Sequence, residues 1–115
     1  MDDINKLSDL EGIIQSCLLK EEDIIFCSKL LLMLTMSSEN REWIEDLCIE
    51  IINSQRDVEL CGLAVTCLGH LARIHRSISQ KKVMEVLKPL MINTELSGRV
   101  EEAISDIKFF TKNTK

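Results

Sequence analysis

Aromatic residues and helix breakers are scarce in this sequence. Its 115 residues include three Phe, one Trp and no Tyr, together with one Pro and four Gly. So few aromatic rings leave little surface on which the bases of a single-stranded nucleic acid could stack. The scarcity of Pro and Gly favours long, uninterrupted helices. No apolar run is longer than Leu30 to Leu34, which is far too short to span a membrane.

Basic residues are outnumbered by acidic ones. The net charge is −5 and the pI is about 5.0, so the phosphate backbone of a nucleic acid would be repelled. Residues 1–59 hold 14 acidic and 5 basic residues, net −9, whereas residues 60–115 hold 5 acidic and 9 basic residues, net +4. An acidic half predicts attraction to a basic partner. The same charges are also explained by an ordinary solvated surface.

The cysteines and histidines lack the spacing of a metal or redox motif. None of the five cysteines forms a C-x-x-C pair, and His70 and His75 are five residues apart, so they do not share a helix face well. We therefore expect reduced, buried thiols in a cytoplasmic protein, and no metal site. No Gly-rich phosphate loop or nucleophile elbow is present, so we expect no cofactor and no enzymatic activity. The acidic N-terminus has no long apolar core and is unlike a secretory signal.

Two apolar stripes recur along the chain. The first occurs three times, 34 and then 39 residues apart, at Leu10, Ile13, Ile14, Cys17 and Leu18; at Ile44, Leu47, Cys48, Ile51 and Ile52; and at Val83, Val86, Leu87, Leu90 and Met91. The second occurs 34 and then 42 residues apart, interrupted only by Asp106, at Ile24, Cys27, Leu30, Leu31 and Leu34; at Val58, Cys61, Ala64, Val65 and Leu68; and at Val100, Ala103, Asp106, Ile107 and Phe110. Steps of one and three residues trace one face of an α-helix, not the alternation of a strand.

Each pair of stripes predicts two helices joined by a turn, and one such unit cannot bury its apolar face unless neighbours stack on it. We therefore predict a single all-α domain, residues 1–115, of three stacked antiparallel helix pairs at about 4–35, 41–76 and 80–112. The expected helices span about 4–18, 21–35, 41–53, 57–76, 80–92 and 98–112. Asp57 and Ser79 are predicted to cap two of them, and Pro89 to kink the fifth.

Three further residues have a structural interpretation. Gly62 and Gly69 lie seven residues apart on one stripe of the predicted fourth helix, where the lack of a side chain would permit close approach of a neighbouring helix. Trp43, the only Trp, is adjacent to a stripe residue. We expect it to cover the edge of the core, and an interface role stays open because Trp is enriched at binding hot spots.

The segment Asp57 to Ala72 carries a resemblance to a known family. Asp57-Val58 at its start, then Ala64, then Leu68-Gly69, resembles the second helix of a HEAT repeat, and Pro89 in a first helix also fits that family. The 34-residue spacing would suit tetratricopeptide repeats as well, but the Trp, Tyr and Pro positions of that family are not met. The resemblance implies a HEAT-like α-solenoid, a class of scaffolds that bind other macromolecules.

In size, acidity and style the chain is also similar to the small helical immunity proteins of bacterial contact-dependent growth inhibition systems, some of which pair with toxic ribonucleases. This resemblance implies a cytoplasmic inhibitor, monomeric when free, that binds a basic ribonuclease toxin domain and blocks its active cleft. The alternative is a HEAT-type adaptor or scaffold that binds a helix or peptide of another protein. Neither function involves a nucleic acid or a membrane as partner.

The HEAT resemblance implies where a partner binds, because second helices line the concave side of HEAT-like stacks, and the residues expected there are Glu22, Glu59, Leu63, Glu101 and Glu102. Glu42 and Glu45 on the polar side of the third predicted helix complete the predicted partner-binding residues, so the concave side and the acidic half of the chain both stay open as the binding surface. The carboxylates of these residues would mimic RNA phosphates, while Leu63 and Leu60 would add apolar contact. Each acid could equally be an ordinary solvent-facing charge.

Overall fold

The computed structural model describes residues 12, 14–18, 20 and 23–111. All regular secondary structure in this described part is helical, which confirms the predicted all-α class. The helices are α2 (Ile24–Ser37), α3 (Arg41–Ser54), α4 (Val58–His75), α5 (Gln80–Leu87), the 3-10 helix η1 (Lys88–Ile92) and α6 (Ser97–Phe110). Residues 12, 14–18 and 20, which belong to the first predicted pair, are helical too.

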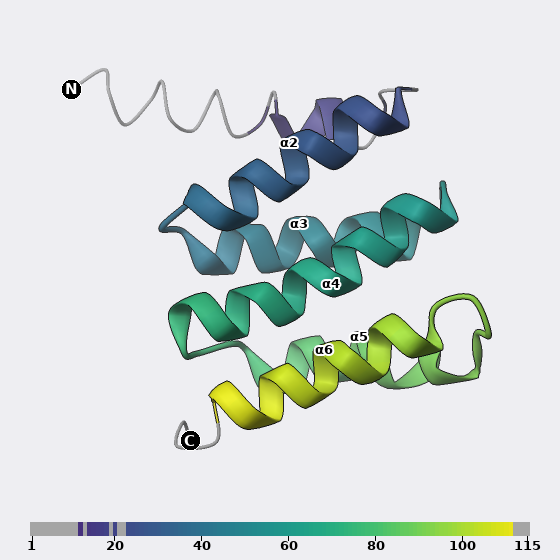
Figure 1. Cartoon of the computed structure of the whole chain (residues 1–115). Coiled ribbons are helices and arrows are strands. Elements are labelled where there is room, and N and C mark those ends of the chain that lie inside the picture. The colour runs from purple at the N-terminus through teal and green to yellow at the C-terminus, as the bar shows by residue number, and fades with distance from the viewer. Residues whose placement is uncertain (1–11, 13, 19, 21–22, 112–115) are drawn as a thin grey trace.

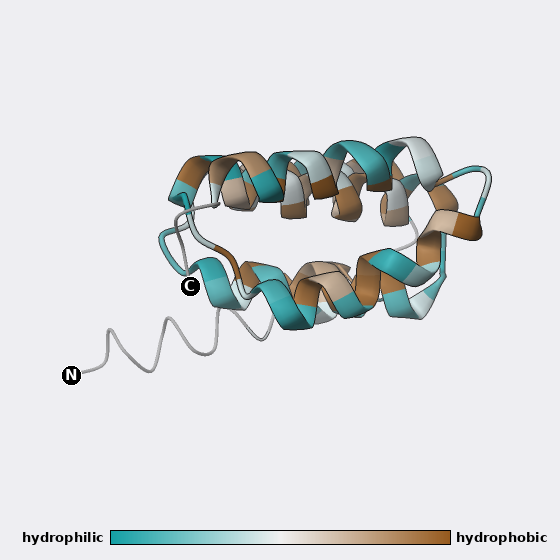
Figure 2. Ribbon diagram, turned by 90° about the horizontal axis from the view of Figure 1, so that it is seen from below, coloured by the Kyte–Doolittle hydropathy of each residue, from teal (hydrophilic) through white to brown (hydrophobic). Residues whose placement is uncertain are grey.

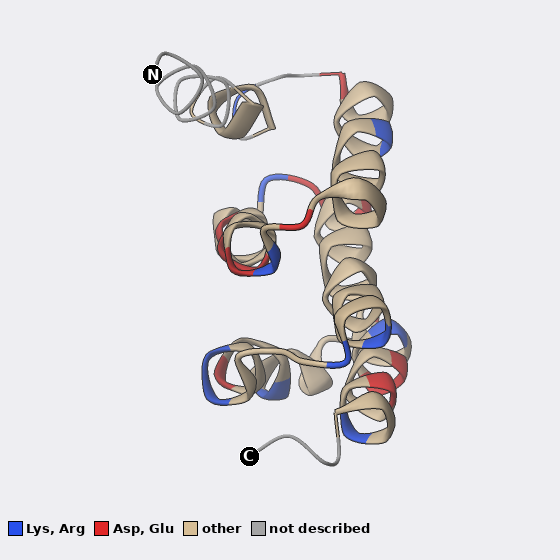
Figure 3. Ribbon diagram, turned by 90° about the vertical axis from the view of Figure 1, so that its left-hand side faces the viewer, with Lys and Arg blue, Asp and Glu red and all other residues tan. Residues whose placement is uncertain are grey.

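The helices are arranged in two layers around α4. Helices α2, α4 and α6 follow one another in one layer, and α3 and α5 lie in the other (Figures 1 and 3). Helix α4 contacts α2, α3 and α6, so it is the centre of the packing. The hydrophilic segments lie largely on the outer sides of the two layers (Figure 2). This arrangement leaves α2 and α6 at opposite ends of their layer.

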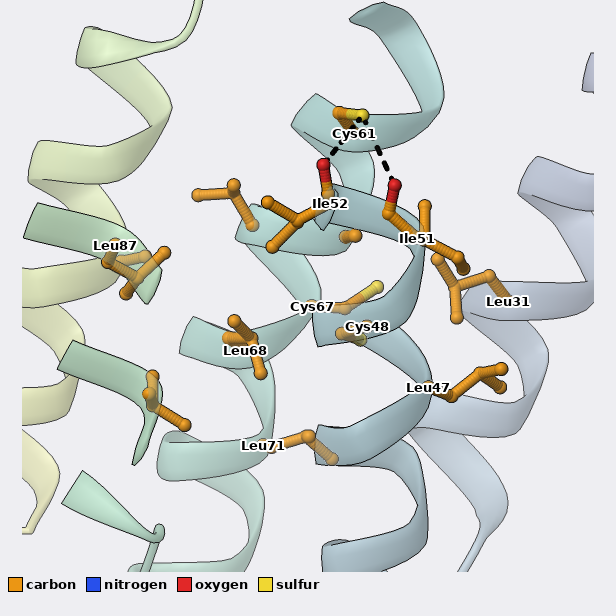
Figure 4. Close-up of a cluster of buried hydrophobic side chains, with 14 of the residues drawn as sticks. Leu31, Leu47, Cys48, Ile51, Ile52, Cys61, Cys67, Leu68, Leu71 and Leu87 are labelled. Carbon is orange, nitrogen blue, oxygen red and sulfur yellow. Dashed lines mark hydrogen bonds between the residues drawn. The ribbon is translucent and has the colours of Figure 1, made fainter. Parts of the chain in front are cut away.

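The core lies between the layers and is richest around α4. The buried residues of α4 are Leu60, Cys61, Gly62, Ala64, Val65, Cys67, Leu68, Gly69, Leu71 and Ala72. They meet Leu31 from α2, Leu47 and Ile51 from α3, and Leu87 from α5 (Figure 4). Trp43 is half-buried against this cluster, as expected of a residue at the edge of the core.

Polar side chains define the helix starts. The Asp57 carboxylate accepts a hydrogen bond from the Leu60 backbone N–H at 2.9 Å, which confirms the predicted cap. Asp23 and Asn40 cap α2 and α3 in the same way. The prediction that the Ser79 side chain caps the fifth helix is wrong. Ser79 occupies the cap position of α5, but its side chain makes no cap hydrogen bond.

Pro89 divides the predicted fifth helix into two segments. The α-helix ends at Leu87, and Lys88–Ile92 continue as the 3-10 helix η1 with Pro89 in its first turn. Pro has no N–H to donate and its ring clashes with the carbonyl four residues earlier, so α-helical hydrogen bonding stops. The tighter 3-10 geometry continues the chain. Pro89 thus disrupts the predicted helix 80–92, which consists of an α-helix followed by a 3-10 helix.

Gly69 allows α4 and α6 to approach closely. A Cβ atom built on Gly69 would lie 3.2 Å from the Cα atom of Ala103 in α6. The predicted close approach of a neighbouring helix is thus confirmed at this position. At Gly62 the nearest obstacle is different, since a Cβ atom there would meet the Arg99 side chain at 2.9 Å.

Substituting Gly69 tests this contact. We expect Gly69→Leu to lower the free energy of unfolding by about 1–3 kcal/mol, because the added atoms overlap the backbone of α6. Gly98→Leu is the matched control, since a Cβ atom on Gly98 meets nothing within 4 Å. Chemical denaturation of both variants measures the difference. Equal stabilities would contradict the close contact between α4 and α6.

Candidate protein-binding face

A polar hollow of about 340 Å³ lies between α4 and α6. Its lining residues come from both helices: Thr66, His70, Arg73, Arg99, Glu102, Ala103, Ser105 and Asp106. Residues three and four apart share one face of a helix, so each helix presents one polar stripe to the hollow. Asp106 among these lining residues is the one that breaks the repeated apolar stripe.

The hollow combines charges of both signs. Arg99 Nη1 donates to Thr66 Oγ1 at 3.0 Å, which links α6 to α4. Arg73 Nη2 lies 2.6 Å from His70 Nδ1. Burial and the Arg73 guanidinium lower the pKa of His70, and the Asp106 carboxylate opposes them. The His70 imidazole therefore shares the hollow with two guanidinium and two carboxylate groups.

A second hollow of about 330 Å³ adjoins the first and shares Arg99 with it. Glu59 at the start of α4 lines this second hollow, and Glu102 lines the first. The structure therefore brings these two predicted residues to different sides of one arginine. Glu101 is also exposed and lines a separate hollow with Lys108. Leu63 is half-buried against the core.

The remaining predicted acids do not join this face. Glu42 is exposed on α3, in the other layer, where it pairs with Arg41 at 3.4 Å. The charged residues of α3 and α6 accordingly appear on separate layers (Figure 3). Glu22 lies outside the described residues. The predicted set is thus divided between two surfaces, and Glu59, Glu101 and Glu102 remain on the layer of α4 and α6.

The structure corrects the prediction that Glu45 binds a partner. Its side chain is 0% exposed, so it cannot offer a carboxylate to a partner, and its predicted solvent-facing position is wrong. Arg41 Nε lies 2.7 Å from one carboxylate oxygen and Lys82 Nζ 3.6 Å from the other. The Ser79 backbone N–H also donates to this carboxylate at 3.1 Å. A buried carboxylate needs such partners, and these join α3 to the start of α5. Leu60 is likewise buried, with 1% exposure, so it offers no surface contact.

Removing the buried carboxylate should destabilise the fold. We expect Glu45→Ala to lower the free energy of unfolding by about 1–3 kcal/mol, because Arg41 and Lys82 lose their shared partner. Asp46→Ala is the matched control: Asp46 also pairs with Lys82, at 2.7 Å, but is 63% exposed. Its loss should cost less than about 1 kcal/mol. Urea denaturation compares the two, and a larger loss for Asp46→Ala would refute this role of Glu45.

Helix α2 carries an apolar surface that the sequence analysis did not assign to binding. Ten large hydrophobic residues are exposed in the described part of the chain. Five of these lie on α2: Ile25, Phe26, Leu32, Met33 and Met36. The available signal was composition, since Lys29 is the single charged residue among the 14 of α2. A helix that is apolar all round needs cover on every side.

Four of the five cysteines belong to the core. Cys27, Cys48, Cys61 and Cys67 are buried, and the Cys61 thiol donates to the Ile51 carbonyl at 3.4 Å (Figure 4). A hydrogen bond between the thiols of Cys48 and Cys67 raises the pKa of Cys48 and lowers the pKa of Cys67. Cys67 is fully enclosed, so the lower pKa does not make it an accessible nucleophile.

The part of the chain that the structure describes contains neither a cluster of metal ligands nor a membrane-spanning helix. Among the described residues, no three His, Cys, Asp or Glu side chains gather closely enough to hold a metal ion. No helix in the described ranges has both the length and the apolar character needed to cross a bilayer. Comparison of the chain with protein-family models, curated proteins and solved structures finds no match. The function of the candidate face therefore has to be inferred from its own residues.

The proton affinity of His70 tests the electrostatics of the first hollow. An NMR titration should give a pKa below the ordinary 6.5. Arg73→Gln should raise this pKa and Asp106→Asn should lower it further, because they remove opposite charges. Since the pKa in the folded state lies below that in the unfolded state, protons bind the unfolded chain better, and stability should fall as the pH drops below 6.5. A pKa unchanged by both substitutions would contradict these contacts.

Proposed function

We propose that this protein binds another protein stoichiometrically, as an immunity protein that neutralises a basic ribonuclease toxin. The face formed by α4 and α6 makes the contact and covers the active cleft of the toxin. The observation that carries the proposal is the exposure of Glu59 and Glu102 at two open hollows on either side of Arg99. The single layer of α2, α4 and α6 supports a HEAT-like α-solenoid, in which these would be the second helices (Figure 1).

The chemistry of this face suits pairing with individual charged groups. Glu59, Glu101 and Glu102 can accept hydrogen bonds from Lys or Arg side chains that otherwise hold RNA phosphates. Arg73 and Arg99 weaken the general attraction of the face for a cation. Specificity therefore depends on the match of single charges, and Arg99 can donate to an acidic group on the partner. Such contacts mainly speed association and weaken as salt is added.

A second candidate function is a HEAT-type adaptor that binds a helix or peptide of another protein. The observation that favours it is the exposed apolar surface of α2, because the immunity proposal gives this surface no role. An adaptor would show binding without protection against a toxin.

A rescue experiment tests the immunity function. The C-terminal domain encoded by the gene immediately upstream is expressed in bacteria, with and without this protein. We expect the domain alone to stop growth and this protein to restore it. The double variant Glu59→Lys and Glu102→Lys should lose protection and weaken binding of the purified domain by about tenfold or more, since like charges then face each other.

Glu42→Lys is the matched control, because it reverses an exposed acid on α3, in the other layer. It should protect as well as the wild type. Circular dichroism establishes that all variants are folded. If this protein does not restore growth, the immunity function is wrong. If it does and Glu42→Lys alone loses protection, the function stands but the binding face lies on α3.

A further inference from the structure

The exposed apolar residues of α2 form one continuous stripe. Ile25, Leu32 and Met36 are 70%, 39% and 54% exposed and lie on one side of the helix with Lys29. The positions 25, 29, 32 and 36 are separated by four, three and four residues, which is the seam spacing of paired helices. Phe26 and Met33, 46% and 57% exposed, flank this seam. Cys27, Leu31 and Thr35 are the buried residues of α2, on the side that packs into the core.

The two ends of the layer differ in the surfaces they present. Helix α2 lies at one end and α6 at the other (Figure 1). Exposed positions of α6 include the charged residues Glu101, Glu102 and Lys108, and Phe109 is the one large hydrophobic residue exposed on it, against five on α2. The end helix of a helical stack normally has such a polar outer surface, because no neighbour covers it. The apolar stripe of α2 departs from this rule, which is the mark of an interaction site.

Lys29 indicates which charge a helix packed against this stripe would need to carry. It is exposed within the stripe and is the one charged residue of α2. The ion pairs found among the described residues do not include it. A helix covering this seam would remove the ammonium group from water, which is costly without an opposite charge. A carboxylate in the seam of that helix would satisfy it.

We propose that the outer face of α2 docks an amphipathic helix of another protein whose apolar seam carries one Asp or Glu opposite Lys29. From Ile25 to Met36 the seam extends about 16 Å, or three turns, so the partner needs a helix of at least that length. The single charge pair fixes the register, as polar residues do in coiled-coil seams. This docking deepens the adaptor function proposed above, on which it rests, and it does not depend on the face of α4 and α6.

A second copy of this chain fits the surface poorly. Pairing two α2 helices would bury two Lys29 side chains, and α2 has no acidic residue to meet them. An anionic membrane also fits poorly, because α2 belongs to the half of the chain with a net charge of −9, from 14 acidic and 5 basic residues. A helix with an acidic seam residue is the occupant that these charges favour.

Two synthetic peptides test the proposal. Both are labelled amphipathic helices of about four turns with a Leu and Ile seam; one carries Glu in the seam and the other carries Lys. Fluorescence anisotropy with the intact protein should show binding of the Glu peptide. Lys29→Glu should weaken that binding about fivefold and strengthen binding of the Lys peptide by a similar factor. Met33→Glu should weaken both.

Lys108→Glu is the matched control, since it reverses an exposed lysine on α6 and should change neither peptide. The proposal would be overturned if the wild type bound the two peptides with equal affinity. It would also be overturned if Lys29→Glu did not bind the Lys peptide more tightly than the Glu peptide. A dimer at micromolar concentration that Met33→Glu dissociates would assign the surface to a second copy. Binding to phosphatidylserine vesicles that Met33→Glu abolishes would assign it to lipid. The variants of Glu59 and Glu102 should leave peptide binding unchanged, which separates this test from that of toxin binding.

Discussion

Burial of α4 on three sides is the constraint on which the structure depends. A helix can have close neighbours on several sides only where its residues are small, and α4 has Ala64, Gly69 and Ala72 in its buried set. At Gly69 the backbone of α6 comes so near that a Cβ atom would be 3.2 Å from Ala103. The polar residues Thr66, His70 and Arg73 are left along the outer edge of this contact. The location of the candidate face is therefore a consequence of how α4 packs.

The apolar stripes predicted the helices well, because periodicity reports directly which residues share a face. Helix α3 spans Arg41–Ser54 against the expected 41–53, and α4 spans Val58–His75 against 57–76. Periodicity does not report how many faces of a helix are covered. Glu45 and Leu60 lie beside their stripes and are buried because α3 and α4 each have more than one neighbour. Periodicity also gives no sign of the exposed apolar side chains of α2, because they lie outside its repeated stripe.

The charge distribution of the sequence identified only some of the acidic residues that lie together on the face of α4 and α6. Net charge counts every carboxylate equally, whether it faces a partner, pairs internally or lies on the other layer. Glu45 is used inside the protein by Arg41 and Lys82, and Glu42 lies on α3. Arg73 and Arg99 then add positive charge among the acids of α4 and α6. None of these effects is visible in a sum over the sequence, because each depends on contacts between distant segments.

The carboxylate of Glu45 also bears on the order in which the molecule comes apart. It pairs with Arg41 of its own helix α3. It also accepts a hydrogen bond from the Ser79 backbone N–H, 34 positions along the chain, and pairs with Lys82 of α5, 37 positions along the chain. Detaching α5 from α3 would take away Lys82 and the Ser79 N–H at once and leave the carboxylate with Arg41 alone. Local opening at that boundary is therefore opposed by electrostatics as well as by apolar contact. The buried carboxylate therefore couples the opening of α5 to that of α3.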